Sequence, residues 1–395
     1  MILVLNCGSS SVKFQLIEIA TRRLLAKGLV SRISMRGAQL TYEVPGREIL
    51  NVTGEILDHG AAIANILDIL TDKEYGVISD KSVITGVGHR VVHGGEFFSD
   101  SVLITKDVLD KISQCNDYAP LHNPHNIKGI IACQQILANV PNIAVFDTAF
   151  HHHIPDYAYR YGIPTVFYKK HGIRRYGFHG TSHYYVSHRV QELMRNTFIS
   201  VITCHLGNGC SITAVKDGKS IDTSMGFTPL EGLLMGTRSG DIDAAVVLQI
   251  MQKERMNAVD ATAMLNKFSG LLGVSGVSND MRDIESEISK GNEDALLAHN
   301  IFCYRLKKYI GAYYTALGGA NAIVFTGGIG ENSVLTREKT LEGLECIGIF
   351  FDKERNKKAV GCEMQISTNI SPTKVFVIPT NEELVIAVDT AKLIK

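Results

Sequence analysis

The sequence has no excess of charge and no long apolar run. Its 40 basic and 40 acidic side chains balance to a formal net charge of zero, so the composition gives no indication of nucleic-acid or membrane-surface binding. The apolar start of the chain, residues 2–5, is too short for a signal peptide, and no run approaches the length that spans a bilayer. We therefore expect neither a nucleic-acid nor a membrane partner. The remaining composition, 45% hydrophobic and 20% charged, is that of an ordinary globular protein.

The chain also lacks paired cysteines. Its eight cysteines are scattered and form no C-x-x-C pair. This pattern has neither the spacing of a thiolate metal site nor the framework of a small secreted disulfide protein, and it favours a reduced protein in the cytoplasm. The three consecutive histidines at 151–153 do not predict a metal site, because adjacent side chains rarely all point at one ion.

Two familiar nucleotide-binding motifs are missing as well. The segment "KDGKS" at 216–220 looks like the end of a P-loop, but that motif requires glycine where this chain has Thr213. The segment "TGGIG" at 326–330 follows an apolar run but lacks the G-x-G-x-x-G spacing. On motif grounds the chain is neither a P-loop NTPase nor a nicotinamide-binding Rossmann protein.

What is present is an alternation of strand-like and helix-like segments in a chain of 395 residues. This length exceeds one ordinary core, so two domains are expected, and the alternation predicts an α/β architecture. Helices are expected over 293–317, over 180–194 and in 239–251, the last with Ala244, Val247, Leu248 and Met251 on one side. Strands are expected at 2–6, 12–19, 83–92, 143–147, 200–205, 211–215, 322–326 and 374–378.

A weak internal repeat links the two halves of the chain. Residues 2–19 and residues 200–219 both read as an apolar strand, a small polar turn and a second strand. Small turn residues let backbone N–H groups approach an anion, and Lys13 adds a positive charge. The repeat suggests a duplicated fold with two facing domains, whose turns would grip a phosphate chain. The alternative is that both segments are only tight turns.

Dense polar clusters carry a more specific signal. The clusters are "GHRVVHGGE" (88–96), "PLHNPHN" (120–126), "VFDTAFHHHIP" (145–155), "RRYGFHGTSH" (174–183), "HLGNGCS" (205–211), "GFTPLEGLLMGTRSGDID" (226–243), "SNDMRD" (278–283), "FTGGIGENS" (325–333) and "PTNEEL" (379–384). Together they resemble the acetokinase family, within the acetate and sugar kinase, heat-shock chaperone and actin superfamily. The resemblance runs from residue 2 to about residue 388.

The resemblance implies two actin-like, ribonuclease H-like domains, each with a β-hairpin followed by an α/β layer. The first domain would comprise residues 1–150 and a C-terminal helix at about 384–395. The second, 151–383, would carry most of the nucleotide site and the interface of a homodimer. ATP and an acid would bind in the cleft between the domains.

The implied activity is the reversible phosphorylation of acetate by ATP, giving acetyl phosphate and ADP. Acetate is already ionised at pH 7, so the reaction needs no general base. The difficulty is bringing one anion against another, so we expect positioning and charge neutralisation by arginine and Mg²⁺, or Mn²⁺ in its place.

The resemblance assigns four catalytic residues. Arg90 would hold the acid's carboxylate through two parallel donors. His179 and Arg238 would stabilise the transferring phosphoryl group. Asp147 ends a buried strand, where α/β folds place ligand-facing groups, and a metal-linked role fits it better than base catalysis.

The resemblance also assigns binding residues. Asn6 and Glu382 would be metal-linked, although Glu383 competes with Glu382 for that role. The apolar end of the acid would meet Val92, Leu121, Phe178 and Pro229. The nucleotide would meet Ser9, Ser11, Lys13, His205, Leu206, Gly207, Asn208, Gly209, Asp280, Met281, Arg282, Gly328, Ile329, Gly330, Glu331 and Asn332.

Three alternatives stay open at this point. A propionate kinase would share nearly all these motifs. An actin-like or chaperone-type ATPase switch would share the two hairpins, but would have no reason for Arg90, His179 and Arg238 around a small apolar pocket. In a sugar kinase, Asp147 would instead act as a base on a hydroxyl group.

Overall fold

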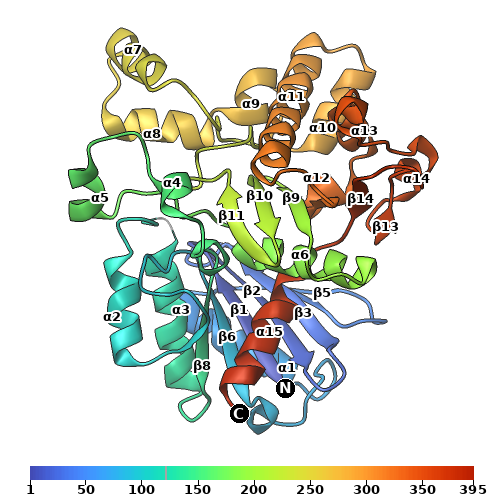
Figure 1. Cartoon of the computed structure of the whole chain (residues 1–395). Coiled ribbons are helices and arrows are strands. Elements are labelled where there is room, and N and C mark those ends of the chain that lie inside the picture. The colour runs from blue at the N-terminus through green and yellow to red at the C-terminus, as the bar shows by residue number, and fades with distance from the viewer. Residues whose placement is uncertain (121) are drawn as a thin grey trace. The chain divides into compact units, whose positions relative to one another are not determined.

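The computed structural model describes residues 1–120 and 122–395, and it divides into two compact units (Figure 1). Unit 1 comprises Met1–Phe150 together with Asn381–Lys395, and unit 2 comprises His151–Thr380. Each unit contains one mixed β-sheet with helices packed on it. Among the described residues, no helix is long and apolar enough to cross a membrane.

The sheet of unit 1 has the strand order β5-β4-β3-β2-β1-β6-β8-β7. β1 and β2 form an antiparallel hairpin whose tip is 8–10, and β1, β6 and β8 run parallel. The strands are β1 (Ile2–Cys7), β2 (Ser11–Glu18), β3 (Arg23–Ser31), β4 (Ala38–Glu43), β5 (Leu50–Gly54), β6 (Gly86–Val91), β7 (Val102–Leu103) and β8 (Asn142–Phe146). The helices are α1 (His59–Leu70), η1 (Lys81–Val83), α2 (Lys106–Gln114), α3 (Asn123–Ile136) and α15 (Glu382–Leu393), with η2 (Ala149–His151) at the end of the first segment.

The two faces of this sheet bury different side chains. Because successive strand residues point to opposite faces, Leu3 and Leu5 pack in a core with helix α1 while Val4 packs with helix α15. Figure 1 shows α15 lying along the sheet beside β1 and β6. Gly88 permits this approach, since a Cβ there would lie 2.5 Å from the side chain of Ile386. The N-terminal end of α15 is thereby fixed against the parallel strands.

The sheet of unit 2 has the strand order β11-β10-β9-β12-β14-β13. β9 and β10 form an antiparallel hairpin with its tip at 207–209, and β9 pairs in parallel with β12. This repeats the arrangement of β1, β2 and β6, so the predicted duplication of a β-hairpin-plus-α/β fold is confirmed. The strands are β9 (Ser200–Leu206), β10 (Cys210–Lys216), β11 (Lys219–Thr223), β12 (Ala322–Thr326), β13 (Met364–Gln365) and β14 (Lys374–Val377).

The longest helix of unit 2, α11, agrees with the helix expected over 293–317, and it buries an apolar stripe that includes Leu306, Ile310 and Tyr313. The helices are α4 (Asp156–Tyr159), α5 (Thr165–His171), α6 (Gly180–Met194), α7 (Ala244–Glu254), α8 (Ala258–Lys267), α9 (Gly270–Ser275), α10 (Met281–Ser289), α11 (Glu293–Ala316), α12 (Gly327–Asn332), α13 (Val334–Leu341), η3 (Leu344–Ile347) and α14 (Lys353–Lys358).

Two local patterns were misleading in unit 2. The apolar side of α7 faces no core, since the helix has no buried residue and Leu248 is 67% exposed. The segment "GGIG", whose glycines suggest a loop, instead begins the short helix α12, and Gly327 takes a φ of 74° at its start. Apolar spacing indicates which side chains share a face, but not whether another element covers that face.

The buried imidazole of His89 makes acid stability testable. Burial lowers its pKa to about 4, although Nε2 bonds Asn142 Oδ1 at 2.7 Å. In the unfolded chain a histidine has a pKa of about 6.5. Below that pH the unfolded state binds a proton, while His89 in the folded protein stays neutral. The free energy of unfolding therefore falls as the pH drops from 6.5 toward 4. Between pH 7 and pH 5 the wild type should lose about 2 kcal/mol more than His89→Gln. Denaturant unfolding of both proteins at both pH values measures this difference, and equal losses would contradict it.

Candidate active site

Three of the predicted residues lie at one edge of the unit 1 sheet. Asn6, Arg90 and Asp147 fall at or just beyond the carboxyl ends of the parallel strands β1, β6 and β8. Leu5 pairs with His89, so Asn6 and Arg90 occupy one row and point to the face that α15 covers. This edge is where open α/β sheets place ligands.

Arg90 and Asp147 bind each other. Nε and Nη2 of Arg90 donate to the two carboxylate oxygens of Asp147 at 2.8 and 2.7 Å. Asp147 is 2% exposed. Burial opposes the charge on Arg90, but the carboxylates of Asp147 and Glu382 raise its pKa above the ordinary value. The sequence gives separate roles to Arg90 and Asp147; the structure makes them one ion pair, with the Nη1 group of Arg90 outside the fork.

Glu382 faces the same pair from the start of α15. The helix is capped by Asn381, whose Oδ1 accepts from the backbone N–H of Leu384 at 3.1 Å. Burial is the largest cause that raises the pKa of Glu382 to about 7, and Asp147 and Glu383 add to it while Arg90 and Lys13 oppose it. The described residues contain no group of three histidine, cysteine, aspartate or glutamate side chains that could hold a metal ion. A hard cation would therefore draw on carboxylate and amide oxygens and on water.

The hairpin tip of unit 1 is tied to the predicted acid pocket by Asn126. Its Nδ2 donates to the carbonyl of Cys7 at 2.7 Å, and its Oδ1 accepts from the backbone N–H of Val92 at 3.2 Å. Within the tip, the N–H of Gly8 donates to the carbonyl of Ser11 at 2.8 Å. Sequence reasoning assigns Asn126 no role, because its two partners are far from it in the chain. The remaining unit 1 candidates are Ser9, which is exposed, and Leu121, which lies outside the described residues.

In unit 2, His179 is held in an unusual conformation immediately before α6. Its φ is 57°, a left-handed value that is uncommon for histidine. Its Nδ1 lies 2.9 Å from Ser211 Oγ, and its ring stacks on His205 with centroids 4.2 Å apart. Phe178, which precedes it, is buried. The ring is thus fixed from both sides.

A second histidine stands behind this contact. His183 Nε2 lies 2.7 Å from Ser211 Oγ, and its Nδ1 lies 2.7 Å from Thr203 Oγ1. Burial, together with His151 and His205, lowers the pKa of His183 well below its ordinary value, so this ring stays neutral. Sequence reasoning treats His183 as structural and does not find Ser211, whose hydroxyl group joins the two rings.

Arg238 converges with His179 at the hairpin tip of unit 2. A Cβ at Gly209 would lie 3.4 Å from Arg238 Nη1 and 3.5 Å from His179 Nε2. Arg238 Nη1 donates to the carbonyl of Pro229 at 3.0 Å. No carboxylate pairs with Arg238 among the ion pairs of the described residues, and burial lowers its pKa. Two donors therefore flank the glycine tip, one of them a cation without a counter-charge.

A pocket of 580 Å³ in unit 2 is lined by half of the predicted nucleotide residues. Among those that line it, sequence reasoning does not identify Asn279, Glu285 and Ser333. Asn279 is found only through folding, since its Nδ2 donates to Asn208 Oδ1 at 2.9 Å. The predicted residues that line the pocket are Gly207, Asn208, Asp280, Met281, Arg282, Gly328, Ile329 and Asn332.

Other predicted nucleotide residues lie outside this lining. Glu331 Oε1 accepts from the backbone N–H groups of Gly327 at 2.8 Å and Thr380 at 3.1 Å, so its carboxylate secures the start of α12. The rest are His205, Leu206, Gly209 and Gly330 of unit 2, and Ser9, Ser11 and Lys13 of unit 1.

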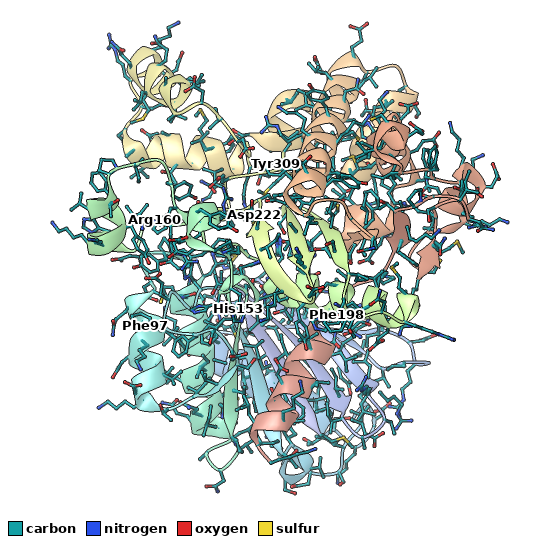
Figure 2. All side chains as sticks on the ribbon, viewed as in Figure 1. Phe97, His153, Arg160, Phe198, Asp222 and Tyr309 are labelled. Carbon is teal, nitrogen blue, oxygen red and sulfur yellow. The ribbon has the colours of Figure 1, made fainter. Side chains whose placement is uncertain are left out.

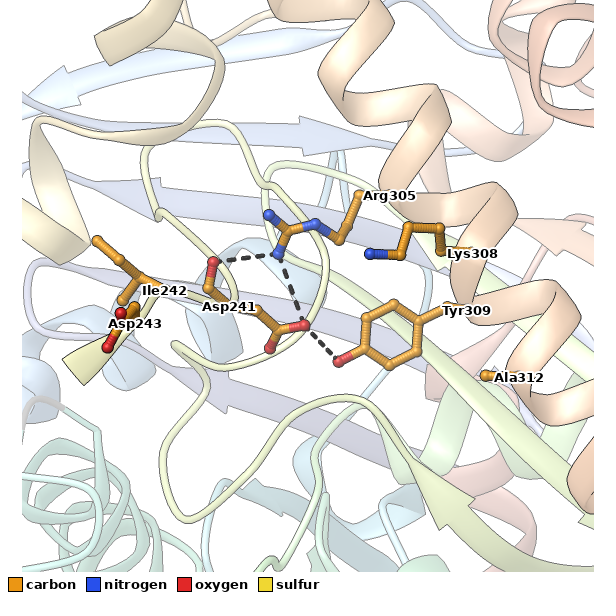
Figure 3. Close-up of a pocket in the computed structure, with 7 residues that line it drawn as sticks. All are labelled: Asp241, Ile242, Asp243, Arg305, Lys308, Tyr309 and Ala312. Atoms are coloured by element: carbon orange, nitrogen blue, oxygen red, sulfur yellow. Dashed lines mark hydrogen bonds and ion pairs between the residues drawn. The ribbon is translucent and has the colours of Figure 1, made fainter. Parts of the chain in front are cut away.

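A second pocket of unit 2, of 430 Å³, contains no predicted site residue (Figure 3). Asp241 Oδ2 accepts from Tyr309 Oη at 2.8 Å and lies 3.5 Å from Arg305 Nη1. Its charged lining is thus engaged in joining the 226–243 segment to α11.

A duplicated hairpin-plus-α/β fold, with a nucleotide-sized pocket and donors converging on a glycine tip, defines a phosphoryl-transfer enzyme of the actin-like class. The chain matches the model of the acetokinase family over residues 1–388. It belongs to that family.

Individual relatives agree with this assignment. An acetate kinase from Caldanaerobacter subterraneus subsp. tengcongensis is 56% identical, over 100% of this chain and 99% of the relative. The crystal structure of Porphyromonas gingivalis acetate kinase matches with a TM-score of 0.97 at 48% identity, covering 100% of this chain and 99% of that one. A propionate kinase from Francisella tularensis subsp. tularensis matches with a TM-score of 0.93 at 45% identity, covering 99% of each chain.

The ion pair of unit 1 gives a stability prediction that is independent of activity. Removing one partner of a buried pair strands the other charge and costs about 3–5 kcal/mol. Arg90→Ala and Asp147→Ala should each destabilise unit 1, and the double variant should lose less than the sum of the two by at least about 1 kcal/mol. Denaturant unfolding of the four proteins measures this coupling.

The exposed pair of Arg189 and Glu363 is the matched control. Its shortest distance is also 2.7 Å, but the side chains are 37% and 34% exposed, so the same cycle should give a coupling below about 1 kcal/mol. Equal coupling in the two cycles would show that burial adds nothing to the Arg90–Asp147 interaction.

Proposed function

We propose that this protein catalyses the reversible transfer of the γ-phosphoryl group of ATP to acetate, giving acetyl phosphate and ADP. The sequence identity of 48–56% to acetate kinases over the whole chain supports this reaction. The observation that carries the mechanism is the convergence of His179 and Arg238 on Gly209. In the proposed reaction these donors would bind the transferring phosphoryl group as its negative charge develops, and stabilising such charge is the largest single contribution to many enzymatic rates.

The nucleophile needs no activation. A carboxylate is ionised at neutral pH, so Asp147 has no proton to remove, and its pairing with Arg90 fits an electrostatic role. The attack forms an O–P bond at the acid's carboxylate oxygen and breaks the bond between the γ-phosphorus and the bridging oxygen of ADP. Rate then depends on positioning the two anions and neutralising their charge.

Each unit contributes part of the chemistry. In unit 2 the pocket that includes Asn208 and Asp280 would hold the nucleotide, and His179 and Arg238 would bind the transferring group. In unit 1 the outer Nη1 of Arg90 would bind the acid. The assignment of Val92, Leu121, Phe178 and Pro229 to the apolar end of the acid rests on the family resemblance and stays a prediction.

A divalent ion fits the oxygen donors of unit 1. Burial and neighbouring carboxylates raise the pKa of Glu382 to about 7 despite the charges of Arg90 and Lys13, so a bound cation would stabilise the ionised form of Glu382. Glu382 and Asn6 would hold Mg²⁺, or Mn²⁺, with Asp147 beside them. When bound, the ion neutralises phosphate charge and orients the nucleotide.

Propionate is the second candidate substrate, because a propionate kinase is 45% identical to this chain over nearly its whole length. One methylene group in an apolar pocket changes the selectivity by about 1–3 kcal/mol. We propose acetate as the first substrate because the curated relatives at 52–56% identity are acetate kinases.

We also propose a homodimer formed through unit 2. The exposed apolar side chains of α7 and α8, such as Leu248 and Val259 at 67% and 76% exposure, support such an interface. We further propose that the protein works in a reducing, cytoplasmic setting. All eight cysteines are free thiols, which supports this location.

A hydroxylamine trap tests the reaction directly. With ATP and Mg²⁺, acetate should give acetyl hydroxamate, and kcat/KM should fall by roughly tenfold for each methylene group added in propionate and butyrate. Arg238→Ala should lower kcat for acetate by roughly 10²- to 10³-fold. ADP release with glucose but no hydroxamate from any acid would overturn the proposal in favour of a sugar kinase.

The metal-linked carboxylate is tested by a matched pair of variants. Glu382→Gln should raise the Mg²⁺ concentration for half-maximal activity by roughly 10- to 100-fold, whereas Glu383→Gln should leave it within about twofold. The measurement is an Mg²⁺ titration of acetate-dependent ADP formation. The reverse pattern would assign the role to Glu383.

A further inference from the structure

A cluster of three side chains fixes the loop that carries Pro229, and the proposed chemistry uses none of them. Tyr161, Arg175 and Glu231 form this group, which we call the Glu231 cluster. The side chains of Arg175 and Glu231 are 16% and 31% exposed. None of the three lines the 580 Å³ pocket. Their contacts nevertheless reach the backbone of residues 223–227, which lies in the chain before Arg238 and is hydrogen-bonded to the segment before His179.

Arg175 grips the start of the loop. Its Nη1 donates to three successive carbonyl groups, those of Thr223 at 2.8 Å, Ser224 at 3.0 Å and Met225 at 3.2 Å. Its Nη2 donates to Glu231 Oε1 at 2.5 Å. One guanidinium group therefore ties the entry of the loop to its far end.

Tyr161 closes the cluster on the other oxygen of Glu231. Its hydroxyl group donates to Glu231 Oε2 at 2.5 Å and accepts from the backbone N–H of Phe227 at 2.8 Å. The contact leaves no room at Gly226, where a Cβ would lie 1.8 Å from Glu231 Oε2 and 2.2 Å from Tyr161 Oη. Gly226, the first glycine in "GFTPLEG", is therefore required by the cluster itself.

The same glycine connects the cluster to His179. The carbonyl of Gly226 accepts from the backbone N–H groups of Tyr176 at 3.1 Å and Gly177 at 3.2 Å. These residues join Arg175 to His179, so both the side chain of Arg175 and the backbone beyond it bind the loop. A shift of the loop would carry the His179 segment with it.

The loop also sets the place of Arg238, whose Nη1 donates to the carbonyl of Pro229 at 3.0 Å. Beyond Pro229 the chain is anchored again at Gly232, whose N–H donates to Asp241 Oδ1 at 2.8 Å. Asp241 is in turn held by Tyr309 (Figure 3). The carbonyl that receives Arg238 thus lies between two anchors.

We propose that Glu231, with Tyr161 and Arg175, is the positioning element that sets His179 and Arg238 at their spacing around Gly209. The inference rests on the proposed function, because it assigns these three residues to the same phosphoryl-transfer step. None of the three lines the 580 Å³ pocket, and they act through the loop and through the backbone of residues 175–179.

The choice of charged groups supports a positioning role over a purely structural one. A partly buried ion pair is weak evidence for stability, since desolvation offsets its attraction and apolar residues often serve as well. What a forked guanidinium–carboxylate contact adds is geometric specificity. Glu231 uses both oxygens on different partners, so it fixes two directions at once.

The test separates positioning from folding by a double-mutant cycle with Arg238. Tyr161→Phe and Glu231→Gln should lower kcat for acetate by about 5-fold and about 20-fold, while KM for ATP stays within about twofold because the nucleotide pocket is untouched. In an Arg238→Ala background, Glu231→Gln should lower kcat by clearly less than the loss of about 20-fold expected in the wild type, since the positioned cation is gone and only the placement of His179 can still be disturbed. Melting temperatures and ATP binding establish that each variant is folded.

Asp222→Asn is the matched control. Asp222 also faces Arg175, at 3.9 Å from Nε, and its side chain is 30% exposed, but it holds no part of the loop after 225. Figure 2 labels Asp222 on β11 and Tyr309 on α11 in this region of unit 2. The control should change kcat by less than twofold.

Three outcomes would overturn the inference: unchanged kcat in Glu231→Gln, an equal loss in the control, or fully additive losses in the Arg238→Ala background. A wild-type protein that forms no acetyl phosphate would instead overturn the proposed function. The two failures are therefore distinguishable.

Discussion

Electrostatic repulsion between a carboxylate and a polyphosphate is the constraint on which the placement of charged residues depends. A mobile arginine relieves little of this repulsion, because ordering its long side chain costs conformational entropy each time it acts. The protein holds each relevant guanidinium group beforehand. Arg90 is fixed by the carboxylate of Asp147, and Arg238 by the carbonyl of Pro229.

The group that holds each arginine decides whether the positive charge of that arginine is neutralised. Arg90 and Asp147 together are neutral, and Lys13 only partly offsets the carboxyl group of Glu382, so this edge of unit 1 keeps acidic groups that the proposed divalent ion would neutralise. Arg238 is held by a dipole and has no carboxylate partner among the ion pairs of the described residues, so it keeps its full charge, and burial strengthens its field. In the proposed mechanism, the cation at the phosphoryl group, Arg238, is thus left uncompensated, while Arg90, the arginine proposed to bind the acid, is oriented by a counter-charge.

Sequence patterns predicted much of the fold because strand and helix periods are local. The hairpin tips at 8–10 and 207–209 and the buried stripe of α11 follow from neighbouring residues. Partner choice does not. Nothing near Arg90 in the chain indicates Asp147, and nothing near Ser211 indicates that it joins His179 to His183. The exposure of α7 could not be predicted from the sequence either, since a stripe of apolar residues does not show whether another element covers it.

The long segment "GFTPLEGLLMGTRSGDID" illustrates why resemblance to a family can assign a candidate site before any contact is known. Only Arg238, and Pro229 beside the acid, have direct roles in the proposed chemistry. Gly226 makes room for Glu231, Gly232 takes a φ of 108° that a side chain would strain, and Asp241 receives the N–H of Gly232. Most residues of such a motif therefore specify where one cation lies. Because that position depends on every turn between the two anchors, the motif must be long, and its length rather than any single residue makes it recognisable.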